Sequence, residues 1–478
     1  MQVISQSEAK TRYTFTKSTE IPATNQDTFD YHAREGALER LVPPWSILTV
    51  TSHEGNIKDG AMSTFKIRLG FIRFPWKAVH FGYVHDLQFQ DKMVEGPFQS
   101  WTHTHSFKPD KTGGCKMEDK IAYSPPFGKI GAMLLNNIIQ NNLKQLFQYR
   151  HRILSNDISL WKLAGRTKGQ KILITGSSGL IGSSLIPMLT AAGEHRITRL
   201  ERPSSRHNDI RSHSLLWDPA RDKVNLKDLE GFDTVVHLAG ENIFGRWTDS
   251  KKQRILESRV KSTQLLCNSL IRLANPPSTL ICASATGFYG NQGSEALTEE
   301  SKPGFGFLSQ VCKAWEESTQ IAKDVGIRVV NTRLGVVLTP KGGMLQKLLA
   351  LSKLGLGLQF GHENQYISWV SIEDVIGSIF YSIIDSSIRG PINVVSANPV
   401  TNLEFSRILA RILKSKIMLP LSQKLARMML GELADSLIVP STLVIPKKLS
   451  FAGYRFINPD LEDTLRLLLG QQQIISQE

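Results

Sequence analysis

The sequence predicts an α/β protein with a parallel sheet at its centre, an α+β domain before it and a small lobe after it. Three observations support this prediction. Residues 1–165 look like strands followed by one long helix, the chain from residue 171 alternates strands and helices, and a glycine-rich turn opens the alternating region. We therefore expect three domains, at residues 1–160, 170–400 and 401–478.

The first region is rich in short runs with strand character, separated by turn residues. These runs predict antiparallel strands at 13–16, 46–51, 61–69, 78–84, 92–95 and 101–107, with helical spacing at 27–41. Over residues 129–153, apolar side chains recur at three- and four-residue steps, which predicts one long amphipathic helix. A curved sheet closed by such a helix buries the apolar faces of both.

The second region alternates in the way that a parallel sheet requires. We expect its strands at 171–175, 196–200, 234–238, 279–285 and 328–333. Helices are predicted between them at 183–192, 249–273 and 308–324, and in the last lobe at 345–354, 402–414 and 422–429.

Composition excludes several classes of protein. The net charge is +14, from 57 Lys and Arg against 43 Asp and Glu, but it is spread along the chain, so we expect no nucleic-acid partner. No apolar run reaches the length of a membrane span, and the N-terminus has no secretory pattern. The four cysteines show no C-x-x-C spacing, and we expect no metal site and a cytoplasmic location.

The strongest local pattern follows the predicted strand Lys171–Thr175. Its glycines have the spacing G-x-x-G-x-x-G, a variant of the dinucleotide-binding fingerprint, and a helix follows. One glycine permits the turn, one lets the backbone approach a diphosphate and one lets the helix pack closely, while the helix N-terminus favours an anion. The predicted cofactor-binding turn is Gly176, Ser177, Ser178, Gly179, Leu180, Ile181 and Gly182.

Two neighbouring strands refine this prediction. The strand at 196–200 leads into Glu201 and Arg202; an acidic residue there suits the ribose of NAD, whereas arginine suits the 2′-phosphate of NADP. We favour NADP, with NAD as the alternative. His237 lies within an apolar run and is expected to be a packed core histidine rather than a base.

Several further stretches resemble the extended short-chain dehydrogenase/reductase superfamily, in particular its atypical epimerase branch, described as cell-division-inhibitor-like nucleotide-sugar epimerases. The resemblance covers roughly residues 170–470 and rests on motifs including Val236–Ile243, Gly245–Thr248, Ser258-Arg259, Ser284–Gly290, Val311–Glu316, Arg333–Leu338, Ser368–Asp374 and Gly431–Ala434. It implies a Rossmann-like sheet followed by a small C-terminal domain. It also implies that Arg202, Leu238, Ala239, Gly240, Arg254, Arg259 and Val337 line the cofactor.

The stretch Tyr31–Trp45 resembles the START-related helix-grip domain that is fused to this branch in some proteins. Such domains enclose an apolar cavity between sheet and helix. The resemblance therefore implies an apolar ligand in the N-terminal domain.

The chain departs from the superfamily in its chemistry. The superfamily's Tyr-x-x-x-Lys pair would fall at Leu308 and Cys312, and neither residue can replace it. Tyr289 as a substitute acid and Cys312 as a nucleophile are weaker alternatives, since Gly-Phe-Tyr-Gly is first a structural turn. Residues 361–369 concentrate polar and aromatic groups, including Tyr366 and Trp369, which suits either a substrate cleft or packing between lobes.

Two functions remain open at this point. One is an NADP-dependent oxidoreductase or epimerase-like enzyme with a nonstandard acid/base and an unidentified small-molecule substrate. The other is a binding or regulatory protein that senses NADP and carries a ligand in its N-terminal domain.

Overall fold

A computed structural model describes residues 12–69, 72–111, 113–163, 169–193, 195–203, 213–353, 355–360, 364–415, 417–421, 432 and 440–472. The chain forms two compact units. The first consists of residues 1–163, 191–193 and 470–478, and the second of residues 164–190 and 194–469. A separate third domain from residue 401 stays a prediction. None of the helices in the described part of the chain combines the length and apolar character that a membrane span needs.

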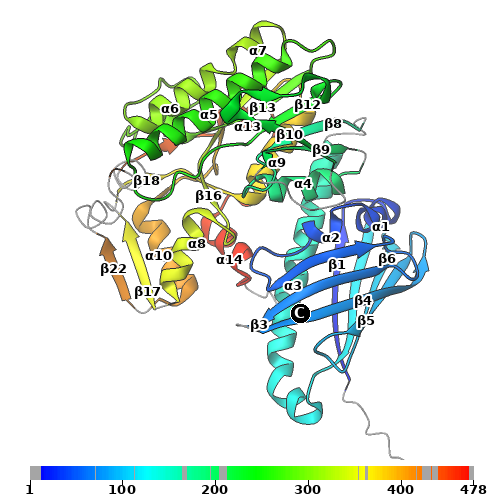
Figure 1. Cartoon of the computed structure of the whole chain (residues 1–478). Coiled ribbons are helices and arrows are strands. Elements are labelled where there is room, and N and C mark those ends of the chain that lie inside the picture. Colours follow the sequence, from blue (N-terminus) through cyan, green and yellow to red (C-terminus); the bar gives the residue numbers. More distant parts are fainter. Residues whose placement is uncertain are drawn as a thin grey trace, which may run out of the picture. The chain divides into compact units, whose positions relative to one another are not determined.

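The first unit is an antiparallel sheet with one long helix (Figure 1). The strand order is β1-β7-β6-β5-β4-β3-β2. The strands are β1 (Tyr13–Ile21), β2 (Leu48–Glu54), β3 (Met62–Leu69), β4 (Ile72–Val84), β5 (Gln88–Glu95), β6 (Ser100–Pro109) and β7 (Cys115–Ser124). The helices are α1 (Asn25–Ala33), α2 (Ala37–Arg40) and α3 (Gly128–Leu163). The strands-then-helix order is confirmed, although β7 was not predicted and the long helix continues ten residues beyond its predicted end.

Alternation along β7 determines what faces the helix. Cys115, Met117, Asp119, Ile121 and Tyr123 are buried, while the residues between them are less so, as expected for a strand with one covered face. Ile121 and Tyr123 pack with Phe147 of α3. A carboxylate, Asp119, therefore lies on the covered face of the sheet.

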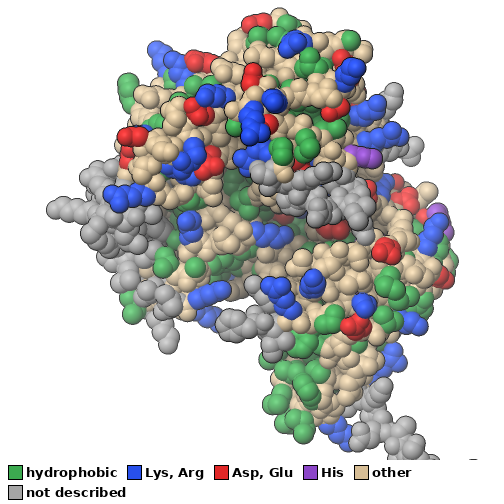
Figure 2. Space-filling view, in the orientation of Figure 1, with side chains coloured by type: hydrophobic (Ala, Val, Ile, Leu, Met, Phe, Trp, Pro, Cys, Tyr) green, Lys and Arg blue, Asp and Glu red, His purple; other side chains and the backbone are tan. Residues whose placement is uncertain are grey.

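The start of α3 is different, because its apolar side chains are exposed. Phe127, Ile130, Met133 and Leu134 are each more than 60 % exposed. Figure 2 shows hydrophobic side chains gathered at this end of the unit. The first two turns of this helix thus expose a stripe of apolar side chains, whereas Leu143 and Phe147 further along are buried.

The second unit is built on an eight-stranded, mostly parallel sheet in the order β11-β10-β9-β8-β12-β13-β15-β20. Its strands are β8 (Lys171–Thr175), β9 (Arg196–Glu201), β10 (His213–Asp218), β11 (Lys223–Val224), β12 (Thr234–His237), β13 (Thr279–Ala285), β15 (Arg328–Leu334) and β20 (Gly390–Val394). The chain order reverses at β8, between β9 and β12, which is where Rossmann-like sheets bind their ligands. The Rossmann-like prediction is confirmed, while β10, β11 and β20 were not predicted.

Helices cover both faces of this sheet. Figure 1 shows α5, α6 and α7 on one face and α4 and α9 on the other. They are α4 (Gly182–Ala191), α5 (Asp249–Leu270), α6 (Phe307–Glu317), α7 (Gln320–Asp324) and α9 (Ile372–Ile384). Ile172, Leu173 and Ile174 of β8 are fully buried, as a strand covered on both faces must be.

Shorter elements follow the sheet. They are η4 (Thr286–Tyr289), β14 (Ala296–Leu297), β16 (Val336–Leu338), α8 (Gly343–Ser352), β17 (Leu356–Phe360), β18 (Tyr366–Ile367), β19 (Trp369–Ser371), β21 (Val400–Thr401), α10 (Asn402–Leu413), β22 (Ile417–Leu421), β23 (Leu443–Val444), α13 (Lys447–Phe451) and α14 (Leu461–Leu469). The helices predicted at 345–354 and 402–414 are confirmed as α8 and α10. The helix predicted at 422–429 lies outside the described residues.

Candidate functional site

The glycine turn between β8 and α4 runs against the end of β12. Gly176 has φ +68°, and a Cβ there would lie 2.7 Å from the carbonyl carbon of Leu238 and 2.8 Å from the nitrogen of Ala239. A Cβ on Gly182 would overlap the carbonyl oxygen of Gly176. Both positions therefore require glycine, one for its backbone angle and the packing, the other for packing alone.

The glycine turn has an exposed backbone just before the N-terminus of α4. Ser178 and Gly179 are exposed, and α4 begins three residues after Gly179. The N–H groups of Ser183 and Leu185 in its first turn bond to the carbonyl oxygens of Gly179 and Ile181, and the positive end of the helix dipole lies at this turn. Such a terminus favours an anion. The Ser177 side chain points into the protein, because its Oγ donates a hydrogen bond to Glu201 Oε1 (3.1 Å) and both residues are buried.

The end of β12 is fixed by a threonine on β8. Thr175 Oγ1 accepts hydrogen bonds from the backbone N–H groups of Leu238 and Ala239, both at 3.2 Å, and lies 2.7 Å from His237 Nδ1. The His237 ring is fully buried, and burial lowers its pKa to about 4. His237 is therefore a neutral core histidine, as predicted. The exposed Gly240 follows three residues after the end of β12.

Three cations surround one carboxylate beyond β12. The pKa of Glu241 is lowered, first by a hydrogen bond from Lys251 Nζ (2.7 Å) and, against the effect of burial, also by the charges of Arg254 and Arg202. Arg202 is exposed directly after β9, and Arg254 is exposed on the second turn of α5. We call Glu241, Arg202, Lys251 and Arg254 the Glu241 cluster.

Arg259 lies about one turn further along α5 than Arg254, and its guanidinium makes two hydrogen bonds to backbone carbonyl oxygens. Its Nη1 donates to the carbonyl oxygens of Glu241 and Ile255, both at 3.1 Å, and its guanidinium lies 5.1 Å from the ring centre of Trp315. A Cβ on Gly240 would lie 3.4 Å from Arg259 Cζ. The guanidinium therefore borders the backbone that follows β12.

Gly342 and Gly343 connect Val337 with the glycine turn, since one lies near Leu180 of the turn and the other near Val337. A Cβ on Gly342 would lie 2.8 Å from Leu180 Cδ1, and one on Gly343 would lie 3.6 Å from the Val337 carbonyl oxygen. The predicted residues thus converge from four places: the glycine turn, the end of β9, the segment from β12 into α5, and β16.

The two positions where the superfamily has tyrosine and lysine face η4. A Cβ on Gly287 would lie 3.3 Å from Leu308 Cβ and 3.7 Å from Cys312 Sγ. Cys312 is buried, and burial raises the pKa of its thiol to about 12. Neither position offers a group that ionises near neutral pH, which argues against Cys312 as a nucleophile.

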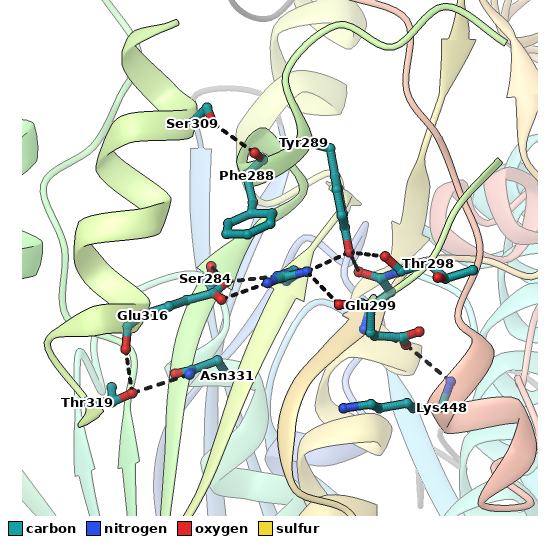
Figure 3. A network of polar contacts seen from close by, with 12 residues as sticks. Ser284, Phe288, Tyr289, Thr298, Glu299, Ser309, Glu316, Thr319, Asn331 and Lys448 are labelled. Atoms are coloured by element: carbon teal, nitrogen blue, oxygen red, sulfur yellow. Dashed lines mark hydrogen bonds and ion pairs between the residues drawn. The ribbon is translucent and has the colours of Figure 1, made fainter. Parts of the chain in front are cut away.

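Tyr289 belongs to a buried polar network (Figure 3). Its hydroxyl lies 2.6 Å from Asn393 Oδ1 and 2.9 Å from Arg333 Nη1, and burial raises its pKa. Figure 3 shows Ser284 and Glu316 at one end of this network and Tyr289 and Thr298 at the other. The fully buried Tyr289 side chain supports the structural interpretation of Gly-Phe-Tyr-Gly over an acid.

The two aromatic residues predicted near a substrate cleft, Tyr366 and Trp369, differ in their exposure to solvent. Trp369 is fully buried, and its Nε1 donates to the carbonyl oxygen of Asn398 (3.1 Å), so it packs in the core and does not stack on a ligand. Tyr366 is half-buried on β18, which pairs with β21. Residues 361–363 lie outside the described residues.

Sequence reasoning missed Lys251 and Glu241. Thr248 caps α5 by accepting a hydrogen bond from the backbone N–H of Lys251, which places Lys251 on the first turn of the helix. A Thr-Asp pair before a helical pattern is a recognisable helix start, so this position was available from the sequence.

The doubly wound parallel sheet, with a glycine turn at its switch point, defines a dinucleotide-binding type of α/β protein. The NAD dependent epimerase/dehydratase family matches residues 172–393, and a domain of unknown function, DUF1731, matches residues 423–468. Epimerase family protein Mb2239 of Mycobacterium bovis is 37% identical over 295 residues, covering 62% of this chain and 96% of that protein. The chain belongs to this epimerase family.

Two solved structures extend the comparison. A nucleoside-diphosphate sugar epimerase from Corynebacterium glutamicum is 31% identical with a TM-score of 0.77, covering 97% of this chain and 91% of that one. Human epimerase family protein SDR39U1 (isoform 2), solved with NADPH, is 27% identical with a TM-score of 0.57, covering 63% of this chain and 99% of that one. The first match therefore includes the N-terminal unit, and the second is short enough to be covered by the second unit alone.

Proposed function

We propose that the second unit binds a nicotinamide dinucleotide at the glycine turn and prefers NADP to NAD. The observation that carries this proposal is the Glu241 cluster, where Arg202, Lys251 and Arg254 gather beyond the ends of β9 and β12. The 2′-phosphate of NADP adds negative charge at that end of a Rossmann crevice. Glu201, which would otherwise suit the ribose of NAD, is buried and accepts the Ser177 hydroxyl.

The residues present fit the cofactor. The exposed backbone of Ser178 and Gly179 and the N-terminus of α4 suit the diphosphate. Leu238, Ala239 and Gly240 would contact the ribose, and Val337 would lie near the nicotinamide. When bound, the nicotinamide ring supplies the capacity to accept or donate a hydride. The NADPH in the human relative supports this assignment.

Coenzyme titration tests the preference. Arg202→Gln should weaken NADPH binding about 10- to 100-fold, because a charge-assisted contact is worth roughly 1.5–3 kcal/mol, and should leave NADH binding within about twofold. Arg389→Gln is the matched control, since this arginine is exposed and precedes β20, the strand at the opposite edge of the sheet from β9. Equal losses for both coenzymes would contradict the NADP preference. The absence of binding by either coenzyme to a folded wild-type sample would refute the whole assignment.

We further propose that the chain is an epimerase-like oxidoreductase acting on a small molecule with an oxidisable hydroxyl or a carbonyl. The relative from Corynebacterium glutamicum supports nucleoside-diphosphate sugars as the first compounds to test. The acid/base must differ from the superfamily's, since Leu308 and Cys312 occupy the usual positions. The assay is the near-ultraviolet absorbance of the reduced coenzyme, and no turnover over a broad sugar-nucleotide panel would count against an enzyme.

The same two neutral positions favour a second candidate, an NADP-sensing binding protein. In it the N-terminal unit, proposed as a START-like helix-grip domain on its strand and helix order, would carry an apolar ligand. A titration experiment distinguishes the two candidates. If the chain is an NADP-sensing binding protein, its affinity for NADPH should change when a fatty acid or other apolar probe saturates the protein. We also propose a cytoplasmic location, supported by the four buried, unpaired cysteines.

A further inference from the structure

The covered face of the first sheet carries an unusual set of side chains. His103 pairs with Asp91 across β5 and β6, and His105 pairs with Asp119 across β6 and β7. His103 and His105 are two residues apart on one strand, so their side chains share a face. The register therefore brings two imidazoles and two carboxylates together beneath α3.

The ring nitrogens of both histidines point toward the same two carboxylates. Asp91 Oδ2 lies 3.3 Å from His103 Nδ1 and 3.8 Å from His105 Nε2. One potential ligand atom from each of the three residues lies within 4.8 Å of the other two. A tetrahedral ion with bonds of 2.0–2.2 Å separates its ligand atoms by about 3.3–3.6 Å. The two contacts of Asp91 are thus close to the spacing that one ion would impose.

The other ring nitrogen of each histidine meets Asp119. Asp119 Oδ1 lies 2.8 Å from His103 Nε2 and 2.7 Å from His105 Nδ1. The ring of His105 is also stacked on Phe89, with ring centres 4.1 Å apart. The contact to His103 is a hydrogen bond, whereas the His105 Nδ1 contact lacks hydrogen-bond geometry. A carboxylate bonded behind an imidazole, fixing its orientation and tautomer, is the usual support of metal-binding histidines.

We propose that Asp91, His103 and His105 bind one divalent first-row transition-metal ion of the zinc type, with Asp119 supporting both histidines from behind. Two imidazoles and a carboxylate suit such an ion. Three protein ligands leave a fourth position, which water or an oxygen of a bound molecule takes.

The site is buried yet close to a hollow. Asp119 is 1 % exposed and His103 is 5 % exposed. Asp119 Oδ2 also lies 2.5 Å from His151 Nε2, and His151 lines a hollow of about 260 Å³ together with Thr19, Gln148 and Asn156. His151 therefore borders both the hollow and the cluster.

A proton is the competing occupant. Burial lowers the pKa of His103, but hydrogen bonds to Asp119 and Asp91 outweigh this effect and raise it to about 9. An imidazolium between the two carboxylates, with Arg150 nearby, would neutralise the cluster without a metal. Direct metal binding by the full chain distinguishes the two.

The experiment uses the full-length protein, stripped with a chelator and then titrated with Zn²⁺ or Co²⁺. We expect one ion per chain and the visible absorbance of four-coordinate cobalt. Asp91→Asn and His105→Gln should each weaken binding more than about 100-fold, and Asp119→Asn about 10- to 100-fold. His213→Gln, which removes an exposed histidine of the second unit, should change nothing.

Histidine-labelled wild-type protein gives an answer that does not depend on how the variants fold. Zn²⁺ should shift the ring resonances of two histidines, one bound through Nδ1 and the other through Nε2. A wild-type chain that binds no ion would overturn the proposal in favour of the proton. Unchanged binding in folded His105→Gln and Asp91→Asn would overturn it as well.

Discussion

Arg333 and Glu316 form a bidentate ion pair within the second unit. Arg333 Nε lies 2.9 Å from Glu316 Oε1 and Nη2 lies 2.8 Å from Oε2, with side chains only 4 % and 12 % exposed. The same guanidinium lies 3.5 Å from the ring centre of Phe288 and bonds to Tyr289. One arginine thus ties β15 to α6 and to η4, beside the positions where the superfamily has its tyrosine and lysine.

Removing Arg333 should destabilise the second unit strongly. Arg333→Ala leaves Glu316 buried without its partner, and we expect a loss of about 3–5 kcal/mol in the free energy of unfolding. Lys313→Ala is the control, because Lys313 is exposed and pairs with the exposed Glu317, so its loss should stay below about 1 kcal/mol. Urea denaturation followed by circular dichroism measures both; similar losses would show that burial of the pair does not matter.

Gly176→Ala should abolish coenzyme binding and destabilise the fold. The positive φ alone costs about 1–2 kcal/mol, and the new Cβ also meets the backbone of Leu238. Gly231→Ala separates these effects, because Gly231 has φ +75° but no atom within 4 Å of an added Cβ. NADPH titration and denaturation of both variants provide the comparison. If Gly231→Ala lost as much stability as Gly176→Ala, the close approach to β12 would have no energetic role.

His237 should make the stability of the second unit depend on pH. The folded pKa of about 4 lies below the unfolded value of about 6.5, so the unfolded chain binds a proton first and stability falls as the pH drops below 6.5. Between pH 7 and pH 5, wild type should lose roughly 2 kcal/mol more than His237→Gln. Denaturation series at several pH values measure this difference, and parallel pH profiles for the two proteins would rule it out.

The cysteines should be inert while the chain is folded. All four are buried, and burial raises the pKa of Cys267 and Cys312 to about 12. A thiol reagent should therefore modify no cysteine in native protein and all four after unfolding, since the thiolate is the reactive form. Rapid native labelling of Cys312, located by peptide mass analysis, would revive it as a nucleophile.

The sequence predicted those parts of the fold that local patterns encode. The bounds of β8 and β13 agree with their apolar runs, and the glycine turn requires glycine at Gly176 and Gly182 as expected. The strand β10 was missed because His213–Asp218 mixes polar residues and lies at the edge of the parallel strands, without a long apolar run.

The parts that could not be predicted depend on register and distant pairing. His103 and His105 show a two-residue period, but nothing local says that Asp91 and Asp119 lie opposite them. Arg333 sits in a predicted strand, yet its partner Glu316 comes from a helix that only the folded sheet brings near. Trp369 looked like a ligand-stacking residue because its sequence neighbours are polar, and its burial is decided by elements far along the chain.

Asp119 contacts three imidazoles at once, those of His103, His105 and His151. Substituting any one of these four side chains would leave a buried polar neighbour without one of its contacts. In homologues that keep the N-terminal unit, we therefore expect the four residues to be conserved together or replaced together. A substitution at one of the four positions should be accompanied by substitutions at the other three.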